Sequence, residues 1–441
     1  MHRALVGIIA MSAAATACGS DGRPSPSDGG FDAGADAGGV DAAADSGAPD
    51  AGVLNCAELL GPGAAFALDP AGLDAQIHPS TVFDGEGIWI AYNTVEEGDT
   101  GLFDVWATRI RCDGTPWVAP FRVNTTLPFN DVDPAIALAG RTMLVTWSSD
   151  DRVGATDNMH GFVRPLDVEG TPVTGSDVEL RTSRIGSPIV DNHLTSAVAP
   201  SDGGFLVAGH RAVIEAARFQ IYVQRVDQAG ALVGEAAEPF FEPMVTQLNP
   251  ALCVPEDGIP WVAWDRGDGV EDQVVYLHLN GGTASPQVVV EGLASSSGVS
   301  LAADATRAGV VYAAIGSVLV GTAQDIRLVD LSTDPATRSV AIIGNRVRNE
   351  VSPLVAPHPA GGGAVAFHRI VSGFQTDMFA VRFTYDGSEL LVGPEVSITT
   401  GTAPYQPALT HVDGDTWFAA WAARVGDTFR LEGRFVEIPA T

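Results

Sequence analysis

The feature that most constrains the fold of this chain is a short apolar phrase that recurs along it. The phrase is an apolar triplet ending in an aromatic residue, and its copies are IAY at 90–92, VTW at 145–147, VAW at 262–264, VVY at 310–312, VAF at 365–367 and AAW at 419–421. A further copy, VAG at 207–209, keeps the spacing and lacks the ring. Self-similarity at a fixed period is the signature of a solenoid or a propeller.

Each repeat unit contains strand and turn signals in the same order. A short strand, often opened by proline, precedes a Gly- or Asp-containing turn and the strand that carries the triplet. A polar loop, a third strand, a hairpin turn and a last strand complete the unit. The strands are rich in β-branched and aromatic residues, and no stretch shows sustained helical periodicity. Each unit therefore predicts a four-stranded antiparallel sheet.

The opening prolines set the period of the repeat. They are Pro79, Pro134, Pro250, Pro353 and Pro407, separated by 55, 116, 103 and 54 residues. The two long gaps each hold one degenerate unit, which opens near Thr195 or Val299. Seven units of four strands predict an all-β, seven-bladed β-propeller over residues 54–441. The expected blades are about 76–126, 130–183, 192–243, 247–292, 297–344, 349–400 and 404–441.

The two ends of the repeat predict how the ring closes. The last unit offers only three strands before the chain stops, and residues 64–69 lie where a fourth strand precedes every other unit. We therefore expect residues 64–69 to complete the seventh blade, which removes an exposed sheet edge. The triplet rings are expected to pack between blades, because the second strand of a blade is covered on both faces.

Net charge excludes one class of partner. The chain has 441 residues and a formal net charge of −30, from 54 acidic and 24 basic residues. Binding to a nucleic-acid backbone depends on Lys and Arg contacts, so we expect no nucleic-acid partner. A neutral or basic partner, or a divalent cation, suits the charge better, and we expect a monomer.

The N-terminus has the layout of a bacterial export signal. Arg3 is followed by an apolar core and by small residues at 13–17 that lead directly to Cys18. The run Ala-Thr-Ala-Cys resembles the lipobox of bacterial lipoproteins, although Ala15 stands where Leu is more usual. The resemblance implies that residues 1–17 are a lipoprotein signal peptide and that Cys18 is acylated. An ordinary secretory signal with a cysteine at this place is the alternative.

Residues 18–53 predict a disordered acidic tether. They consist almost only of Gly, Ala, Asp, Ser and Pro, which cannot bury enough apolar surface to offset chain entropy. With a lipid on Cys18, this segment would hold the propeller off a membrane. The expected location is the cell envelope, as an outer-membrane or cell-surface lipoprotein that faces the periplasm or the outside. The whole layout resembles Gram-negative lipoproteins with such a tether and a propeller-like domain, a resemblance that implies no particular activity.

The remaining cysteines predict one disulfide. Cys112 lies in the hairpin after the third strand of the first blade, and Cys56 precedes the closing strand, which starts on the same side. A Cys56–Cys112 disulfide is therefore reasonable in an oxidising compartment. Cys253 lies within a first strand and is expected to be a buried free thiol.

Candidate binding residues gather on the face where the first strands begin. The polar residues just before each first strand would ring the mouth of the central channel, where they could hold a ligand or ion. Strand-start capping and solvation are the alternative. These residues are Gln76, His78, Asp131, Asp133, Gln247, Asn249 and Gln406, with His193 and Glu350 at related positions.

Calcium is the only cofactor that the sequence suggests. The acidic run at 265–272 contains Asp265, Asp268 and Asp272, whose oxygens could supply part of a Ca²⁺ site. The run lacks the regular alternate-Asp spacing of known calcium loops. No other cofactor is expected.

No catalytic motif stands out in the sequence. It has no G-x-S-x-G, no H-E-x-x-H and no P-loop. Residues 410–417 come close to the Asp-box of sialidases, but their Asp413 is one place late and the turn joins strands one and two. We therefore expect a membrane-anchored module whose outward face binds a protein or glycan. The alternative is a carbohydrate-active hydrolase or lyase on the same scaffold.

Overall fold

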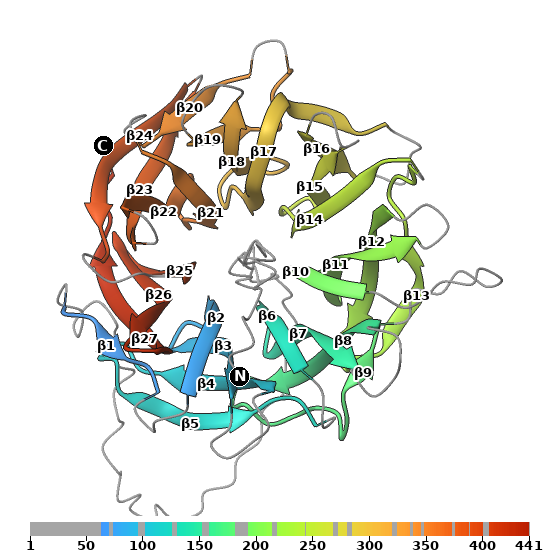
Figure 1. Cartoon of the computed structure of the whole chain (residues 1–441), viewed down its shortest axis with the longest axis vertical. Helices are drawn as coiled ribbons and strands as arrows, with labels where there is room; N and C mark the ends of the chain where they lie inside the picture. Colours follow the sequence, from blue (N-terminus) through green and yellow to red (C-terminus); the bar gives the residue numbers. More distant parts are fainter. Residues whose placement is uncertain are drawn as a thin grey trace, which may run out of the picture.

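The computed structural model describes residues 63–69, 74–95, 102–125, 130–151, 158–180, 193–213, 218–242, 244–267, 272–279, 285–319, 324–335, 338–344, 348–372, 375–387, 389–399 and 405–440. The regular elements in these ranges are all β-strands, arranged as seven antiparallel blades around a common axis (Figure 1). The predicted seven-bladed β-propeller is confirmed. Within the described ranges, no helix has the length and apolar character needed to cross a membrane.

Blades one to four run from the innermost to the outermost strand in chain order. Blade one is β2 (Asp74–Phe83), β3 (Ile88–Val95), β4 (Phe103–Ile110) and β5 (Pro116–Arg122). Blade two is β6 (Asn130–Ala139), β7 (Thr142–Asp151), β8 (Asn158–Asp167) and β9 (Val178–Glu179). Blade three is β10 (His193–Ser201), β11 (Gly204–Val213), β12 (Arg218–Asp227) and β13 (Leu232–Ala237). Blade four is β14 (Thr246–Cys253), β15 (Trp261–Gly267), β16 (Asp272–His278) and the first part of β17 (Gln287–Ala303).

Blades five to seven keep the same order. Blade five is the second part of β17, then β18 (Val311–Leu319), β19 (Asp325–Asp330) and β20 (Val340–Ile343). Blade six is β21 (Glu350–Pro357), β22 (Gly363–Ser372), β23 (Gln375–Asp386) and β24 (Glu389–Ser397). Blade seven is β25 (Tyr405–Asp413), β26 (Thr416–Val425), β27 (Thr428–Glu437) and β1 (Phe66–Ala67).

Blades four and five share one strand. The first part of β17 pairs with β16 as far as Leu293, and the strand pairs with β18 from Leu293 onward. Hydrogen bonding therefore joins the two blades into a single seven-stranded sheet. The sequence predicted two strands here, in separate blades, and did not show that the backbone stays extended between them.

The ring closes between the two ends of the chain. Phe66 and Ala67 of β1 pair with Gly433 and Glu432 of β27, and the amide of Leu68 donates to the carbonyl of Leu431 at 3.0 Å. The blue β1 accordingly lies along the red β27 in Figure 1. This confirms that the stretch at 64–69 completes the seventh blade, and its pairing covers the outer edge of β27.

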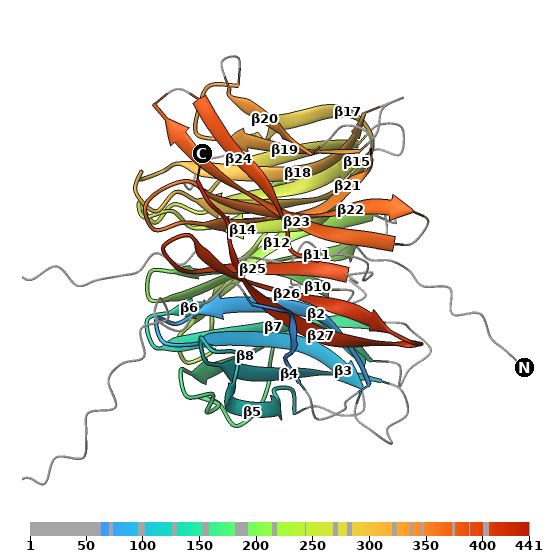
Figure 2. The ribbon, with the colours of Figure 1, turned by 90° about the vertical axis from the view of Figure 1, so that its left-hand side faces the viewer.

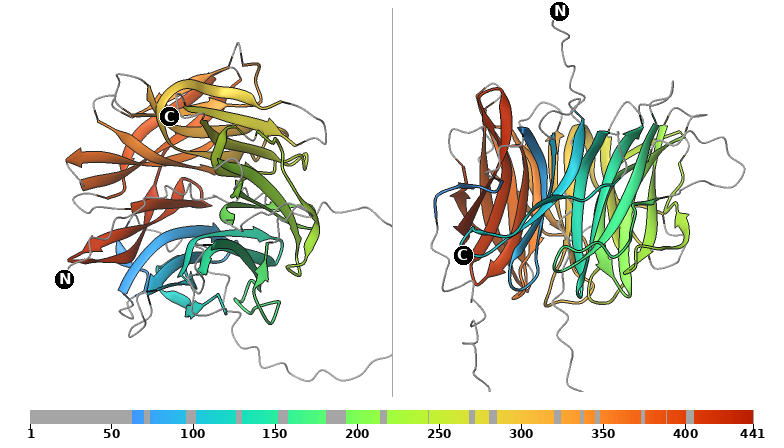
Figure 3. Two further views of the ribbon diagram at one scale, coloured as in Figure 1. Left: turned by 45° about the vertical axis from the view of Figure 1, so that its right-hand side comes forward. Right: turned by 90° about the horizontal axis from the view of Figure 1, so that it is seen from below.

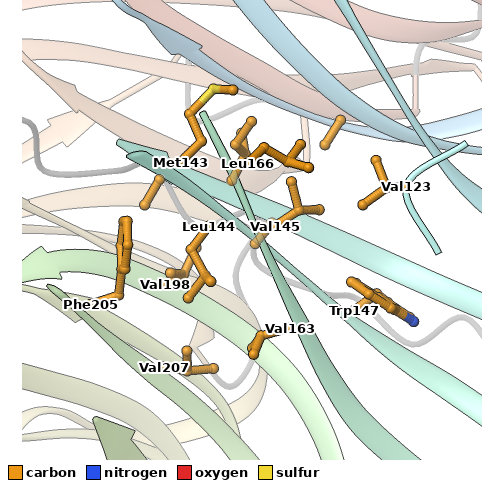
Figure 4. Close-up of a cluster of buried hydrophobic side chains, with 14 of the residues drawn as sticks. Val123, Met143, Leu144, Val145, Trp147, Val163, Leu166, Val198, Phe205 and Val207 are labelled. Carbon is orange, nitrogen blue, oxygen red and sulfur yellow. The ribbon is translucent and has the colours of Figure 1, made fainter. Parts of the chain in front are cut away.

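The hydrophobic core lies between neighbouring blades, where the repeated triplets meet. The rings of the six complete triplets are at most 1% exposed: Tyr92, Trp147, Trp264, Tyr312, Phe367 and Trp421. Figure 4 shows the boundary of blades two and three, where Leu144 of β7 lies near Val198 of β10 and Val207 of β11. Burying one aromatic side chain contributes about 1.5–3 kcal/mol, so these contacts carry much of the closure of the ring.

The ring has two faces with different connections. The innermost strands begin, and the second strands end, on one side, which we call the mouth face. Turns between strands one and two, and between strands three and four, lie on the other side, which we call the hairpin face. Figure 2 and the right-hand view of Figure 3 show the ring from the side, with the strands running between these two faces.

Candidate functional site

The innermost strands carry unusual backbone at the mouth face. The residues before four of the opening prolines have a positive φ: 56° at His78, 56° at Asp133, 50° at Asn249 and 51° at Ser352. The residue before a proline is normally extended, and a left-handed residue other than glycine costs about 1–3 kcal/mol. Strain of this kind is held in place by the surrounding structure, and here it recurs in blades one, two, four and six.

The strained residues lie in β-bulges. In each of these four blades the register between the first and second strand shifts at the proline, for example between Ile77 and Ser80 or between Val132 and Ala135. A bulge bends the strand and redirects one side chain. The bulge therefore gives His78 and its equivalents a different direction from the residues that precede them.

His78 of blade one and Asp133 of blade two are in contact across the blade boundary. The imidazole Nδ1 lies 2.5 Å from the carboxylate Oδ1, and the two side chains are 23% and 10% exposed. Buried Asn93 accepts a hydrogen bond from the amide of Asp133 at 3.0 Å and donates to the carbonyl of Asp131 at 2.9 Å. Two bulged strands thus hold the pair in place while solvent still reaches it.

His210 of blade three lies near this pair and is neutral. It is 6% exposed, its ring meets Phe219 edge-on at 5.2 Å, and burial lowers its pKa to about 4 while the charge of Asp133 acts in the opposite direction. His368 of blade six is 4% exposed, and burial likewise lowers its pKa to about 4. Both histidines lie within second strands, because β11 and β22 extend past them.

Asn249 of blade four makes a separate contact at the mouth face. Its side-chain amide donates to Asp265 Oδ2 at 3.0 Å, which links the first and second strands of that blade. Asp265 is one of the three predicted calcium ligands. The structure does not describe the side chains of the other two. Asp268 lies outside the described residues, and only the backbone of Asp272 is described. Calcium binding stays a prediction.

Three of the predicted mouth residues are buried and bond neighbouring segments. Gln76 accepts a hydrogen bond from the amide of Leu431 at 2.8 Å, and Gln247 accepts one from the amide of Ile221 at 3.1 Å. Asp131 accepts a hydrogen bond from the amide nitrogen of Asn124 at 2.6 Å. Each of the three is at most 1% exposed. They join blades, and ligand binding by them stays a prediction.

Asp131 has the most perturbed carboxyl among the described residues of the mouth face. Burial, together with the charges of Asp104 and Asp177, raises its pKa to about 7, against hydrogen bonds from Ser149 and Asn124 that lower it. A raised carboxyl pKa often marks a general acid. Asp131 is only 1% exposed and already accepts a hydrogen bond from Asn124, so we interpret it as a structural residue that holds the strand of Asp133 in place.

Three arginines lie near the ends of the second strands of blades three, four and six, and each is paired. Arg211 meets Glu238. Arg266 holds Glu242 through two hydrogen bonds of 2.7 and 2.6 Å. Arg369 bridges Glu350 and Glu395 at 2.9 and 2.5 Å, which explains why Glu350 is fully buried. These pairs fix the mouth face, because an unpaired buried charge is strongly destabilising.

Several predicted residues fall outside the described parts of the chain. These are Cys18, Cys56 and the whole of residues 1–62, and the side chains of His193 and Gln406 are likewise not described. Cys112 is disulfide-bonded, and pairing with Cys56 stays a prediction. Cys253 is a buried free thiol, as expected.

Comparisons with known proteins support the architecture. No protein-family model matches the chain, and no curated protein matches it significantly. A polysaccharide lyase described as an ulvan lyase of a new family has a TM-score of 0.54 at 11% identity, over 83% of this chain and 95% of its own. A Dyadobacter fermentans protein of unknown function has a TM-score of 0.50 at 12% identity, over 85% of this chain and 98% of its own.

A third solved structure is more distant. Trypanosoma rangeli sialidase has a TM-score of 0.49 at 12% identity, over 82% of this chain and 54% of its own. At these identities the likeness concerns the fold alone. The chain is therefore a seven-bladed β-propeller similar in architecture to propellers of known and of unknown activity.

Proposed function

We propose that this protein is a carbohydrate-active propeller that cleaves glycosidic bonds at its mouth face, with His78 and Asp133 as the proton-transferring pair. The observation that carries the proposal is the 2.5 Å contact between a solvent-reached imidazole and a carboxylate, on two strained bulges of neighbouring blades. Propellers of known activity with this architecture include a polysaccharide lyase, which supports the same reading.

The pair is suited to moving a proton. The Asp133 carboxylate lies against Nδ1 of His78 as a close contact without hydrogen-bond geometry. We propose that it turns into a hydrogen bond when substrate binds, which would fix the tautomer of the imidazole and leave Nε2 as the atom that accepts a proton. In the hydrolysis we propose, His78 Nε2 takes a proton from water, the water oxygen attacks the anomeric carbon, and the bond to the leaving oxygen breaks. The leaving oxygen takes a proton from a carboxylic acid, which completes the proton balance of the step.

Charge favours a neutral glycan as the substrate. The chain carries a formal net charge of −30, which repels an acidic polysaccharide at long range.

A second candidate reaction is β-elimination on an acidic glycan, in which His78 would remove the proton next to a sugar carboxylate. An imidazole as the base favours elimination over hydrolysis, because glycoside hydrolysis commonly uses two carboxyl groups.

We further propose that the propeller is exported and anchored through a lipid on Cys18. Support comes from the lipobox-like run before Cys18 and from the Gly, Ala and Asp composition of residues 19–53. Such an anchor would place the mouth face where extracytoplasmic glycans are met. Radiolabelled palmitate incorporated into the wild type but not into Cys18→Ser would support the anchor, and labelling of both would contradict it.

The activity test uses the chain from residue 18 onward with Cys18→Ser. It is incubated with neutral polysaccharides and with a uronate polysaccharide, while new reducing ends and the ultraviolet absorbance of unsaturated sugars are followed. We expect reducing ends without absorbance, and a loss of about 10²–10⁴-fold in His78→Gln and Asp133→Asn. Ser352→Ala is the matched control, because it changes the equivalent strained residue of blade six.

The outcomes separate the alternatives. Absorbance on the uronate polysaccharide would replace hydrolysis by elimination. Retention of uncut glycan by the wild type would indicate a binding module. Cleavage that survives both substitutions would remove the pair from the mechanism.

A further inference from the structure

On the hairpin face, a glycine in each of three blades forms a tight turn that packs against the preceding blade. The turns between the third and fourth strands of blades one, two and three place a glycine amide on the carbonyl three residues earlier, at 2.9, 2.9 and 3.0 Å. The glycines are Gly114, Gly170 and Gly230, with φ of 81°, 85° and 83°.

These glycines are in close contact with the preceding blade. A Cβ at Gly114 would lie 2.8 Å from Phe66 of blade seven, and one at Gly170 would lie 2.6 Å from Trp89 of blade one. A Cβ at Gly230 would lie 2.8 Å from Pro165 of blade two. The tight turn thus caps the end of the inter-blade core.

The corresponding hairpin of blade five is longer. The third strand of this blade ends at Asp330 and its fourth begins at Val340, and the sequence between them, LSTDPATRS, contains no glycine. The longer hairpin leaves a cavity of about 340 Å³ at the boundary with blade four. The walls include Trp261, His278 and Gln287 of blade four and Thr333 and Asp334 of blade five.

The walls of this cavity are rigidly held. Trp261 stacks on His278 with ring centroids 4.6 Å apart and on Tyr276 at 5.5 Å. Arg338 donates to the hydroxyl of Tyr276 at 2.7 Å and to the carbonyl of Thr333 at 3.3 Å. Arg338 therefore links the described part of the blade-five hairpin to the sheet of blade four.

Two wall residues have a hydrogen-bonding group without a partner among the described residues. His278 Nε2 is buried and has no hydrogen-bond partner among the described residues. Trp261 Nε1 shares this property, but so do Trp89 and Trp417 at related positions in other blades, so it belongs to the repeat. His278 is the distinctive group, since a buried polar atom without a partner often marks a ligand or water position.

We propose that this cavity is a second ligand site, which binds a neutral sugar unit on the face opposite to the mouth. Its walls combine aromatic rings, which pack on the C–H face of a sugar, with hydroxyl, amide, carboxylate and imidazole groups, which bond its hydroxyls. The volume lies at the lower end of the range for small-molecule pockets, which suits one or two sugar rings. The site holds a glycan whether or not the mouth face cleaves one.

The test is saturation-transfer NMR on the full chain with Cys18→Ser, using maltose, cellobiose and lactose as probes. We expect transfer to at least one disaccharide, and at least about tenfold weaker binding in Ser285→Trp, which fills the cavity from its rim. Thr171→Trp, an exposed hairpin substitution in blade two, should bind like the wild type. Loss of transfer in Ser285→Trp together with normal transfer in Thr171→Trp would place the bound sugar at this cavity.

A further variant covers the case in which Ser285→Trp does not fold. His278→Phe keeps the ring stack and removes the imidazole nitrogens, and we expect it to weaken binding in the same direction. Absence of transfer from all three disaccharides would overturn the proposal. Equal binding by the wild type, Ser285→Trp and His278→Phe would overturn it as well.

Discussion

The side-chain oxygen of Gln76 accepts a hydrogen bond from the backbone amide of Leu431 at 2.8 Å, although 355 residues separate the two in the chain. The bond joins the innermost strand of blade one to the third strand of blade seven. Both groups are buried, so the contact is shielded from water at the place where the ring closes.

Gln76→Ala should destabilise the propeller by about 1–3 kcal/mol, because it leaves the buried amide of Leu431 without a partner. Urea unfolding followed by tryptophan fluorescence measures the change. Gln228→Ala, on the exposed hairpin of blade three, is the control and should lie within about 0.5 kcal/mol of the wild type. Equal midpoints for the two variants would contradict this role of Gln76.

Gly170→Ala should destabilise by about 2–5 kcal/mol, since it combines left-handed strain with a Cβ placed 2.6 Å from Trp89. Gly140→Ala is the matched control, because Gly140 also has a positive φ, of 62°, but a Cβ there meets nothing within 4 Å. We expect about 1–2 kcal/mol for the control. If chemical unfolding gave the two variants the same stability, the hairpin glycine would have no capping role.

Asp131→Asn should change how stability depends on pH. The folded-state pKa of Asp131 is raised from 3.8 to about 7, so the folded protein binds this proton more tightly than the unfolded chain. The contribution of Asp131 to stability therefore falls as pH rises from about 4 to 7. The variant should gain stability relative to the wild type at pH 8 compared with pH 5.

The control for this experiment is Asp113→Asn, on an exposed hairpin, where the pKa is lowered mainly by a hydrogen bond from Thr115. Thermal unfolding at both pH values gives the comparison. A constant difference between Asp131→Asn and the wild type at pH 5 and pH 8 would show that Asp131 does not titrate in this range.

His358 should make the protein sensitive to acid. Its Nδ1 accepts a hydrogen bond from the amide of Ala360 at 3.1 Å, and its Nε2 donates to the carbonyl of Gly414 of blade seven at 2.9 Å. Burial lowers its pKa from 6.5 to about 4, so the stability it contributes is present above pH 6.5 and is lost as pH falls toward 4.

We expect His358→Gln to be less stable than the wild type at pH 7.5, with a smaller difference at pH 4.5. Urea midpoints at the two values test this. His411→Gln is the control, because its ring lies 4.4 Å from that of His358 and its Nε2 contacts the carbonyl of Gly414 at an exposed position. A deficit for His358→Gln that stays the same at both pH values would exclude protonation of His358 as the cause.

Much of the fold could be predicted because its determinants are local and repeated. Pro79 and Pro134 mark the period, and the aromatic triplets mark the strand that both neighbouring blades cover. The lengths of the second strands could not be predicted: β11 and β22 continue through His210 and His368, whose polar character is typical of loops. Their burial comes from the neighbouring blades, which a local pattern does not represent.

The candidate site was predicted only in part. The positions just before the first strands drew attention to His78 and Asp133, but their contact depends on the spacing between two blades. The sequence also grouped Gln76 and Asp131 with them in one ring. The bulge at each proline decides which of these side chains stays buried between blades, and it leaves no clear signal in the sequence.

Because β17 is one continuous strand shared by two blades, it limits where new chain termini could be introduced. Leu293 pairs with Asp272 on one side and with Leu319 on the other, so a circular permutant with new ends at this point would break two ladders at once. New ends between β9 and β10 would sever a connection between separate sheets instead. The described strands thus form six hydrogen-bonded sheets, one of which spans two blades. We expect the propeller to tolerate new chain ends at the other blade boundaries more readily than at this one.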